Sequence, residues 1–182
     1  MNNLLVLFFC VIGQIPIYAQ KQQSIEIVDL SIKQIRLMEN YINLSSEERN
    51  TVLADSLFTP YQDLWKGYLG EKAAFLDWVN NTAYSELEIY KHRAKEINTE
   101  NLTNKLEKQI KNISELTHKE GSGKWYLFFG PKWTNGGGLG DGIMLIDLAH
   151  YTNTSEEEIQ KIFDHEINHQ IYTTYNLSLI HI

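Results

Sequence analysis

The sequence is poor in cysteine, proline and positive charge. Its 182 residues include one cysteine, three prolines and 16 Lys and Arg against 23 Asp and Glu, which gives a net charge of −7. A single cysteine excludes a disulfide-bonded scaffold and a cysteine-rich metal site. Three prolines and 11 glycines exclude fibrous and proline-rich architectures. The shortage of positive charge argues against a nucleic-acid partner, because that binding depends on neutralising phosphates.

A long hydrophobic run is also missing. The apolar run from Leu4 to Ile12 is too short to cross the roughly 30 Å core of a bilayer as a helix. Pro16 and the small residue Ala19 follow, which is the layout of a secretory signal peptide. We therefore expect residues 1–19 to be a signal peptide and the mature chain to be secreted, periplasmic or in the cell envelope, with no stable membrane span. The alternative is a buried N-terminal strand or helix.

The region from residue 20 to residue 120 has mostly helical spacing and is expected to form the helical part of the domain. Ser45 and Ser46 followed by two glutamates predict a helix start. Trp65 and Trp78 lie within apolar helical patterns, so we expect both in the core. Apolar residues at three- and four-residue steps predict an amphipathic helix near the start of this region: Ile25, Val28, Ile32, Ile35 and Met38.

The pattern changes over residues 121–176. Lys124–Phe129 and Ile143–Leu148 are short and apolar, which predicts two strands. The glycine-rich segment Gly130–Gly142 between them is expected to connect antiparallel strands. It lacks a Gly-Lys-Ser/Thr triplet and leads into a strand, so it does not fit a nucleotide-binding loop. The sequence thus predicts an α+β fold with a helical N-terminal half and a small antiparallel or mixed sheet.

Residues 155–175 predict a helix that carries a metal-binding motif. Ser155 and Glu158 form a capping-box pattern at its start. His165 and His169 are four residues apart, which places both imidazoles on one helix face where they can bind the same Zn²⁺. Glu166 lies beside the first of them and can act as a general base on a metal-bound water. Composition alone produces such an H-E-x-x-H match in roughly one chain in sixty.

This H-E-x-x-H helix, preceded by a strand, resembles that of the zincin metallopeptidases. The order of elements is similar to that of secreted zinc-dependent peptidases of bacteria and of related gliding-motility lipoproteins, which need not be active. The resemblance implies that His165 and His169 are Zn²⁺ ligands on a zincin-type active-site helix. It implies that Glu166 is the catalytic base for attack of water on a peptide or protein substrate, with the edge of Ile143–Leu148 aligning the substrate backbone.

A catalytic zinc usually has three protein ligands and a water, and the third ligand is not evident here. Tyr172 and Tyr175 occupy the positions of the metzincin Gly and His, which excludes that subclass. The sequence pattern does not show which other residue would be the third ligand. Asp164 and Asn168 better fit a role in orienting a ligand imidazole, and either tyrosine could help to stabilise an oxyanion. The candidates for the third ligand are His150, Asp147, Asp164 and His181.

The final residues, 177–182, read LSLIHI, which one frame of a sequencing-library adapter encodes. We therefore hypothesise that they are an adapter-derived tail and that residues 121–176 belong to a C-terminally truncated zincin domain. Such a fragment is expected to be inactive or weakly active. Two other functions remain open. One is a non-catalytic secreted or envelope- and motility-associated protein on a zincin scaffold, and the other is a helical binding module with an accidental motif.

Overall fold

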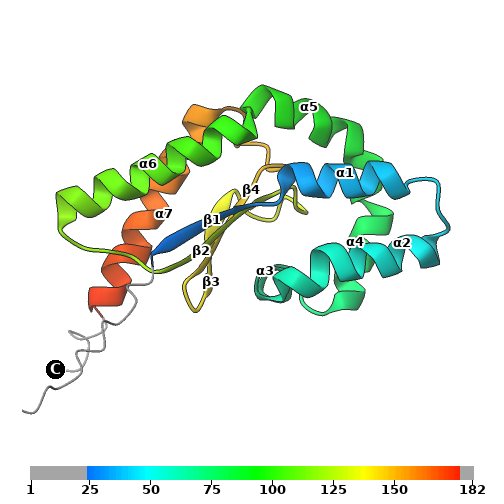
Figure 1. The fold of residues 1–182 in the computed structure, drawn as a ribbon, viewed down its shortest axis with the longest axis horizontal. Helices are drawn as coiled ribbons and strands as arrows, with labels where there is room; N and C mark the ends of the chain where they lie inside the picture. Colours follow the sequence, from blue (N-terminus) through cyan, green and yellow to red (C-terminus); the bar gives the residue numbers. More distant parts are fainter. Residues whose placement is uncertain (1–23, 177–182) are drawn as a thin grey trace, which may run out of the picture.

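The computed structural model describes residues 24–176, with side chains to Tyr172 (Figure 1). The predicted signal peptide and the predicted adapter-derived tail lie outside the described residues. The strands are β1 (Ile25–Asp29), β2 (Gly123–Phe128), β3 (Gly136–Gly140) and β4 (Ile143–Asp147). The α-helices are α1 (Ser31–Tyr41), α2 (Ser46–Leu53), α3 (Gln62–Tyr68), α4 (Lys72–Asn81), α5 (Leu87–Ile97), α6 (Thr99–Thr117) and α7 (Glu156–Asn176). Short π and 3₁₀ turns join α2 to α3 and α4 to α5.

These elements confirm the predicted α+β fold. The four strands form one mixed sheet in the order β1-β2-β4-β3. β1, β2 and β4 are parallel, and β3 is antiparallel to β4 at one edge. Figure 1 shows α6 and α7 together on one side of the sheet and α1 to α4 on the other. No helix within residues 24–176 is long and apolar enough to span a bilayer.

The prediction that β2 and β4 are antiparallel was wrong. The two strands run in parallel, with Trp125 beside Met144 and Phe128 beside Asp147. The segment between them is not a simple connection, because its residues 136–140 form β3 and reverse the chain. A parallel pair needs a connection long enough to return to the starting end of the sheet, and the excursion through β3 provides it. The glycines concealed this strand, because glycine is depleted in strands generally.

The expected helix over the first described residues was also wrong in part. Ile25 and Val28 lie in β1, and α1 begins only at Ser31. Ile25 and Val28 have helical spacing, but Ile25 and Ile27 alternate with Glu26 as in a strand, so the apolar pattern did not separate the two structures. Asp29 marks the boundary, since its carboxylate accepts from the Ser31 N–H (2.8 Å) and hydroxyl (2.6 Å). These bonds satisfy the free Ser31 amide at the start of α1, and β1 ends at Asp29.

Side chains of β2 alternate between the two helical layers, as the pleat of a strand requires. On one face Trp125 packs on Phe163 of α7, with ring centroids 4.4 Å apart. On the other face Phe128 contacts Trp65 of α3 edge to face at 5.1 Å. Trp65 and Trp78 are both buried, with centroids 5.7 Å apart, which confirms their predicted place in the core. The predicted helix start at residues 45–48 is confirmed by a complete capping box.

Asp147, the last residue of β4, is fully buried and holds the start of the edge strand in place. Its carboxylate accepts from the backbone N–H groups of Gly130 (2.8 Å), Lys132 (2.7 Å) and Ala149 (2.9 Å). The Tyr68 hydroxyl of α3 donates to the same carboxylate (3.2 Å). One side chain therefore fixes the loop that leads from β2 towards β3, the turn after β4 and the end of α3.

Tyr68 extends this network towards β3. Burial and the nearby Asp147 charge raise the pKa of its phenol, so the hydroxyl stays protonated and can donate to Asp147. The same oxygen accepts from the N–H groups of Trp133 (3.1 Å) and Thr134 (3.2 Å). The loop before β3 is thus anchored by side chains rather than by a sheet ladder.

Gly136, the first residue of β3, lets α7 approach the edge strand closely. A Cβ at this position would lie 2.7 Å from the Cγ2 atom of Ile162. We expect Gly136→Ala to lower the free energy of unfolding by about 1–3 kcal/mol, because the methyl group forces α7 and β3 apart. Urea unfolding would measure the loss. Gly138→Ala is the control, since its Cβ would meet a flexible methionine sulfur at 3.2 Å, and a loss as large as that of Gly136→Ala would contradict the prediction.

Asp147 also predicts how stability depends on pH. Burial raises the pKa of its carboxyl above the ordinary 3.8, although its hydrogen bonds from Gly130, Lys132, Ala149 and Tyr68 oppose the shift. The folded state then binds this proton more tightly than the unfolded state. The contribution of Asp147 to the free energy of unfolding should therefore fall as the pH rises from the ordinary carboxyl pKa through the raised pKa of the folded state.

The measurement is urea unfolding of the wild-type chain and of Asp147→Asn between about pH 3 and about pH 7. The amide does not titrate, so the other carboxyl groups cancel when the two free energies of unfolding are subtracted. We expect the wild-type value minus the variant value to decrease with rising pH. A difference that increased with pH would show that the hydrogen bonds outweigh burial at this carboxyl.

Candidate metal centre

The helix that carries the motif begins as the sequence predicts. The Ser155 hydroxyl accepts from the Glu158 N–H (3.3 Å), and the Ser155 carbonyl accepts from the Ile159 N–H (3.2 Å). Three glutamates fill the first turn of α7, where negative charge is favourable beside the helix dipole. Glu156 contacts Lys105 and accepts from Asn101 of α6 (3.0 Å), which ties the helix start to its neighbour.

A fully buried stripe holds α7 against the sheet: Ile159, Phe163, Ile167 and Ile171. Gln170, also buried, fastens the far end of the helix. Its carbonyl accepts from the Trp125 indole (2.7 Å), and its amide nitrogen donates to the carbonyls of Ser122 (3.0 Å) and Gly142 (3.2 Å). Ser122 precedes β2 and Gly142 precedes β4, so the rotation of α7 relative to the sheet is fixed. The motif side chains opposite the stripe therefore face away from the sheet.

His165 and His169 come together on that outward face. Their Nε2 atoms are 3.3 Å apart, and their ring planes are nearly perpendicular at 77°. At this distance one imidazole N–H donates to the other ring. Two imidazoles on a tetrahedral metal at about 2.0–2.1 Å also have their nitrogens about 3.3 Å apart, so the separation is compatible with a shared Zn²⁺ but not specific to it. Both residues are exposed, which leaves room for further ligands. Since each neutral imidazole has one acceptor nitrogen, the pair provides two suitable metal donors.

Glu166 lies next to this pair, on the side of α7 that faces β3. Its carboxylate oxygen is 3.9 Å from the His165 Nε2 atom, and its side chain is 23 % exposed. Ile162, one helical turn before Glu166, packs on Gly136 of β3. The partly covered carboxylate is therefore between the imidazole pair and the edge strand. That position suits a base acting on a water bound near the imidazoles, opposite a peptide that follows the strand.

The other candidate ligands do not join the pair. Within residues 24–176, no group of three His, Cys, Asp or Glu side chains could hold a metal ion. Asp147 is buried among backbone donors, and His150 is buried with its Nδ1 atom 2.9 Å from the Thr152 hydroxyl. Asp164 accepts from Gln109 of α6 (2.8 Å). His181 lies outside the described residues.

The predicted supporting residues make different contacts. Asn168 donates to the Asp164 carbonyl (2.5 Å), and in the described part of the chain neither residue hydrogen-bonds to a motif imidazole. The predicted orienting role of these two side chains therefore has no counterpart in the structure. Tyr172 lies under the ammonium of Lys119, 4.6 Å from the ring centroid. The side chain of Tyr175 lies outside the described ones.

The edge strand is the part of the site that sequence reasoning missed. β4 lies between β2 and β3, so Ile143–Leu148 has no free edge and cannot align a substrate backbone, contrary to the expectation. The edge on the side of Glu166 belongs to β3. Gly137 and Gly140 have positive φ angles of 150° and 94°, and a Cβ at either would meet no atom within 4 Å. The run of glycines just before the predicted strand Ile143–Leu148 was the sequence feature that could have indicated an edge strand here.

Comparison with protein-family models, curated proteins and solved structures finds no significant match to this chain. The resemblance to zincins therefore rests on the H-E-x-x-H residues and their helical context. His165, Glu166 and His169 remain a predicted site, with the two imidazoles in contact and the Glu166 carboxylate beside them.

Zinc binding can be tested through thermal stability. We expect Zn²⁺ to raise the melting temperature of the protein, since a ligand at 100 times its Kd stabilises the folded state by about 2.7 kcal/mol. His165→Ala and His169→Ala should each lose this stabilisation. His92→Ala is a matched control, because His92 is an exposed α5 histidine that pairs with Glu96 instead. Equal stabilisation of all three variants would place the zinc elsewhere.

Proposed function

We propose that the chain is a zinc-dependent peptidase that acts outside the cytoplasm after export by residues 1–19. The observation that supports this most strongly is the 3.3 Å convergence of the His165 and His169 Nε2 atoms beside the Glu166 carboxylate. His165 and His169 would hold Zn²⁺. When bound, the ion supplies Lewis-acid chemistry towards a water and a carbonyl oxygen. Because catalytic zinc takes three protein ligands, the proposal includes a third ligand outside residues 24–176.

The protein side chains have separate roles in this proposal. The Glu166 carboxylate accepts a proton from the attacking water and delivers it to the leaving amine nitrogen. Partial burial beside β3 keeps this carboxylate close to the reacting groups. The free edge of β3 offers backbone N–H and C=O groups to an extended peptide, which can add to the sheet as a further strand. The anchors at Gln170 and Asp147 hold α7 and β3 in a fixed relation.

A second function is favoured by a different observation. The His165 side chain is 70 % exposed, and the described residues provide two metal donors rather than three. A non-catalytic envelope- or motility-associated protein on the same scaffold would retain this helix without turnover. It could still bind zinc through the imidazole pair. The two functions therefore differ in peptide hydrolysis rather than in metal binding.

Glu166→Gln separates them. If Glu166 is the base, the amide should lower hydrolysis of a fluorogenic peptide library by at least 100-fold in a protein that includes the third ligand, because the amide cannot accept the proton. Zinc binding, measured by calorimetry, should stay within about twofold, since both imidazoles remain. Glu157→Gln makes the same charge change in an exposed part of α7 and should retain activity. Hydrolysis by Glu166→Gln at the wild-type rate would reject this base. Zinc binding without hydrolysis would favour the non-catalytic function only in a protein that includes the third ligand, because the fragment without it is expected to be weakly active at most.

A further inference from the structure

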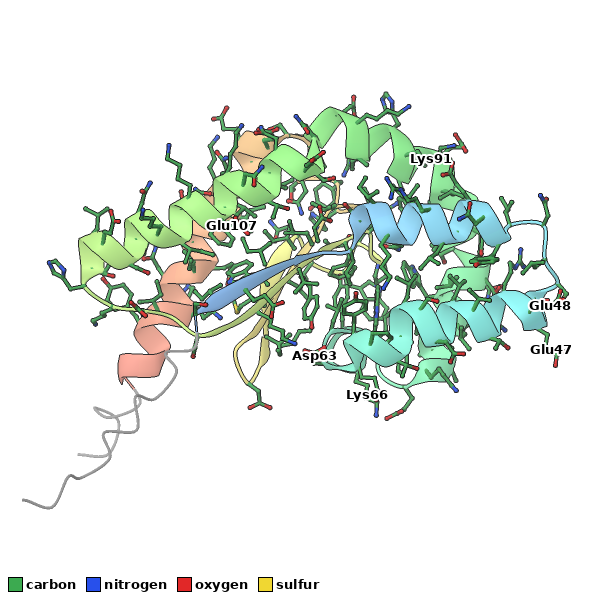
Figure 2. The ribbon with its side chains drawn as sticks, in the orientation of Figure 1. Glu47, Glu48, Asp63, Lys66, Lys91 and Glu107 are labelled. Atoms are coloured by element: carbon green, nitrogen blue, oxygen red, sulfur yellow. The ribbon has the colours of Figure 1, made fainter. Side chains whose placement is uncertain are left out.

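A groove between α1 and α5 lies on the side of the sheet away from α7. It encloses about 240 Å³. Ile32 and Ile35 of α1 and Ala94 of α5 contribute its apolar surface. Figure 2 shows Lys91 on α5 where this helix passes α1. Ile32 is 38 % exposed, whereas Ile35 and Ala94 are buried beneath it at 6 % and 7 %. The accessible apolar surface of the groove therefore comes mainly from Ile32, with Ile35 and Ala94 forming its floor.

The rim of the groove is positively charged. Arg36 and Lys95 line it, and no ion pair or hydrogen bond of either side chain is found among the described residues. Lys91, the third cation, is different, because it pairs with Glu39 of α1 (2.7 Å) and with Glu88 (2.9 Å). The chain as a whole carries a net charge of −7. Two unpaired cations beside an apolar groove thus stand out against an acidic background, and they favour an anionic ligand.

The size of the groove limits the kind of ligand. Pockets for drug-sized molecules enclose about 300–1,000 Å³, so 240 Å³ suits one alkyl chain rather than a fused ring system. A stable protein interface buries about 800 Å² on each partner, which a groove lined by short segments of two helices does not provide. The Lys91–Glu39 ion pair also bridges the two helices and limits the length of the open surface.

From these observations we infer that the α1–α5 groove binds a single-chain anionic amphiphile. The alkyl chain lies on Ile32, Ile35 and Ala94, and the anionic head contacts Arg36 and Lys95. A fatty-acid carboxylate and the phosphate of a single-chain lipid share this chemistry. The inference does not rest on the proposed peptidase activity, because the motif helix α7 contributes no residue to the groove.

Calorimetric titration of the full chain with decanoate and decyl phosphate, both below their aggregation concentrations, tests the inference. We expect saturable binding of one molecule by at least one of them, and the tighter of the two identifies the head group. Decyltrimethylammonium should not bind, because its charge has the wrong sign. Octanoate or octyl phosphate should bind at least threefold more weakly than the ten-carbon ligand, since each buried methylene contributes up to about 0.8 kcal/mol.

Variants locate the site. Arg36→Gln and Lys95→Gln should each weaken binding about threefold to tenfold, the range for partly exposed charge-assisted contacts. Lys108→Gln is the matched control, because it removes the same charge from an exposed position on α6. Ala94→Leu should also weaken binding by filling the groove, provided that circular dichroism shows a folded chain. These four substitutions leave the motif side chains unchanged.

Several results would overturn the inference. Equal weakening by Lys108→Gln and Lys95→Gln would show that net charge, rather than the groove, attracts the anion. Equal affinity for the eight-carbon and ten-carbon ligands would show that the groove does not bind the alkyl chain. Binding of an acidic amphipathic peptide helix at this groove, together with no binding of decanoate or decyl phosphate, would replace the amphiphile with a protein partner.

Discussion

The buried carboxylate of Asp147 is the interaction on which the arrangement of the edge strand depends. Its four donors come from the loop after β2, the turn after β4 and α3. Burying a carboxylate is costly, and hydrogen bonds to the charged form are the usual compensation. Asn153, itself buried, adds bonds to the carbonyls of Asp147 (2.7 Å) and Asn135 (2.8 Å). The chain that leads into β3 and the turn after β4 are thereby joined to the end of β4.

The motif helix is fixed by a different set of contacts. The apolar stripe of α7 sets its depth on the sheet, and Gln170 sets its rotation through bonds to the start of β2 and of β4. The imidazoles of His165 and His169 lie on the opposite face, so they approach each other without help from the core. Stability and chemistry are thus divided between two faces of one helix. Such a division lets a site remain open to solvent on a rigid support.

Much of the fold could be predicted from local patterns. The capped start of α7, the strands β2 and β4 and the buried Trp65 were all evident, because each depends on neighbouring residues. The spacing of His165 and His169 likewise placed them on one face, where the structure finds them 3.3 Å apart. Local sequence did not reveal β1, because Ile25 and Val28 fit a helix as well as a strand. Its pairing with β2 is a long-range contact that spacing does not encode.

The candidate site was less predictable than the helix that carries it. Strand direction is set by the whole connection, so the sequence did not show that β4 lies inside the sheet and that β3 forms the edge. The contacts of Asp164 and Asn168 were equally hidden, because they depend on how α6 packs beside α7. Neither a helical pattern nor a motif contains such information about neighbouring elements. The metal-binding pair was visible because its geometry is confined to a single turn of helix.

The composition of β3 has a consequence for how this edge is organised. Four of its five residues are glycines, so Leu139 alone offers a side chain that can set the register of the strand. Leu139 sits at an irregularity in the ladder with β4 and packs so tightly on α3 that a Cβ at Gly67 would lie 2.9 Å from it. Strands that are rich in glycine specify their register weakly. The contact between Leu139 and Gly67 of α3 therefore sets the register of a strand that otherwise consists of glycines.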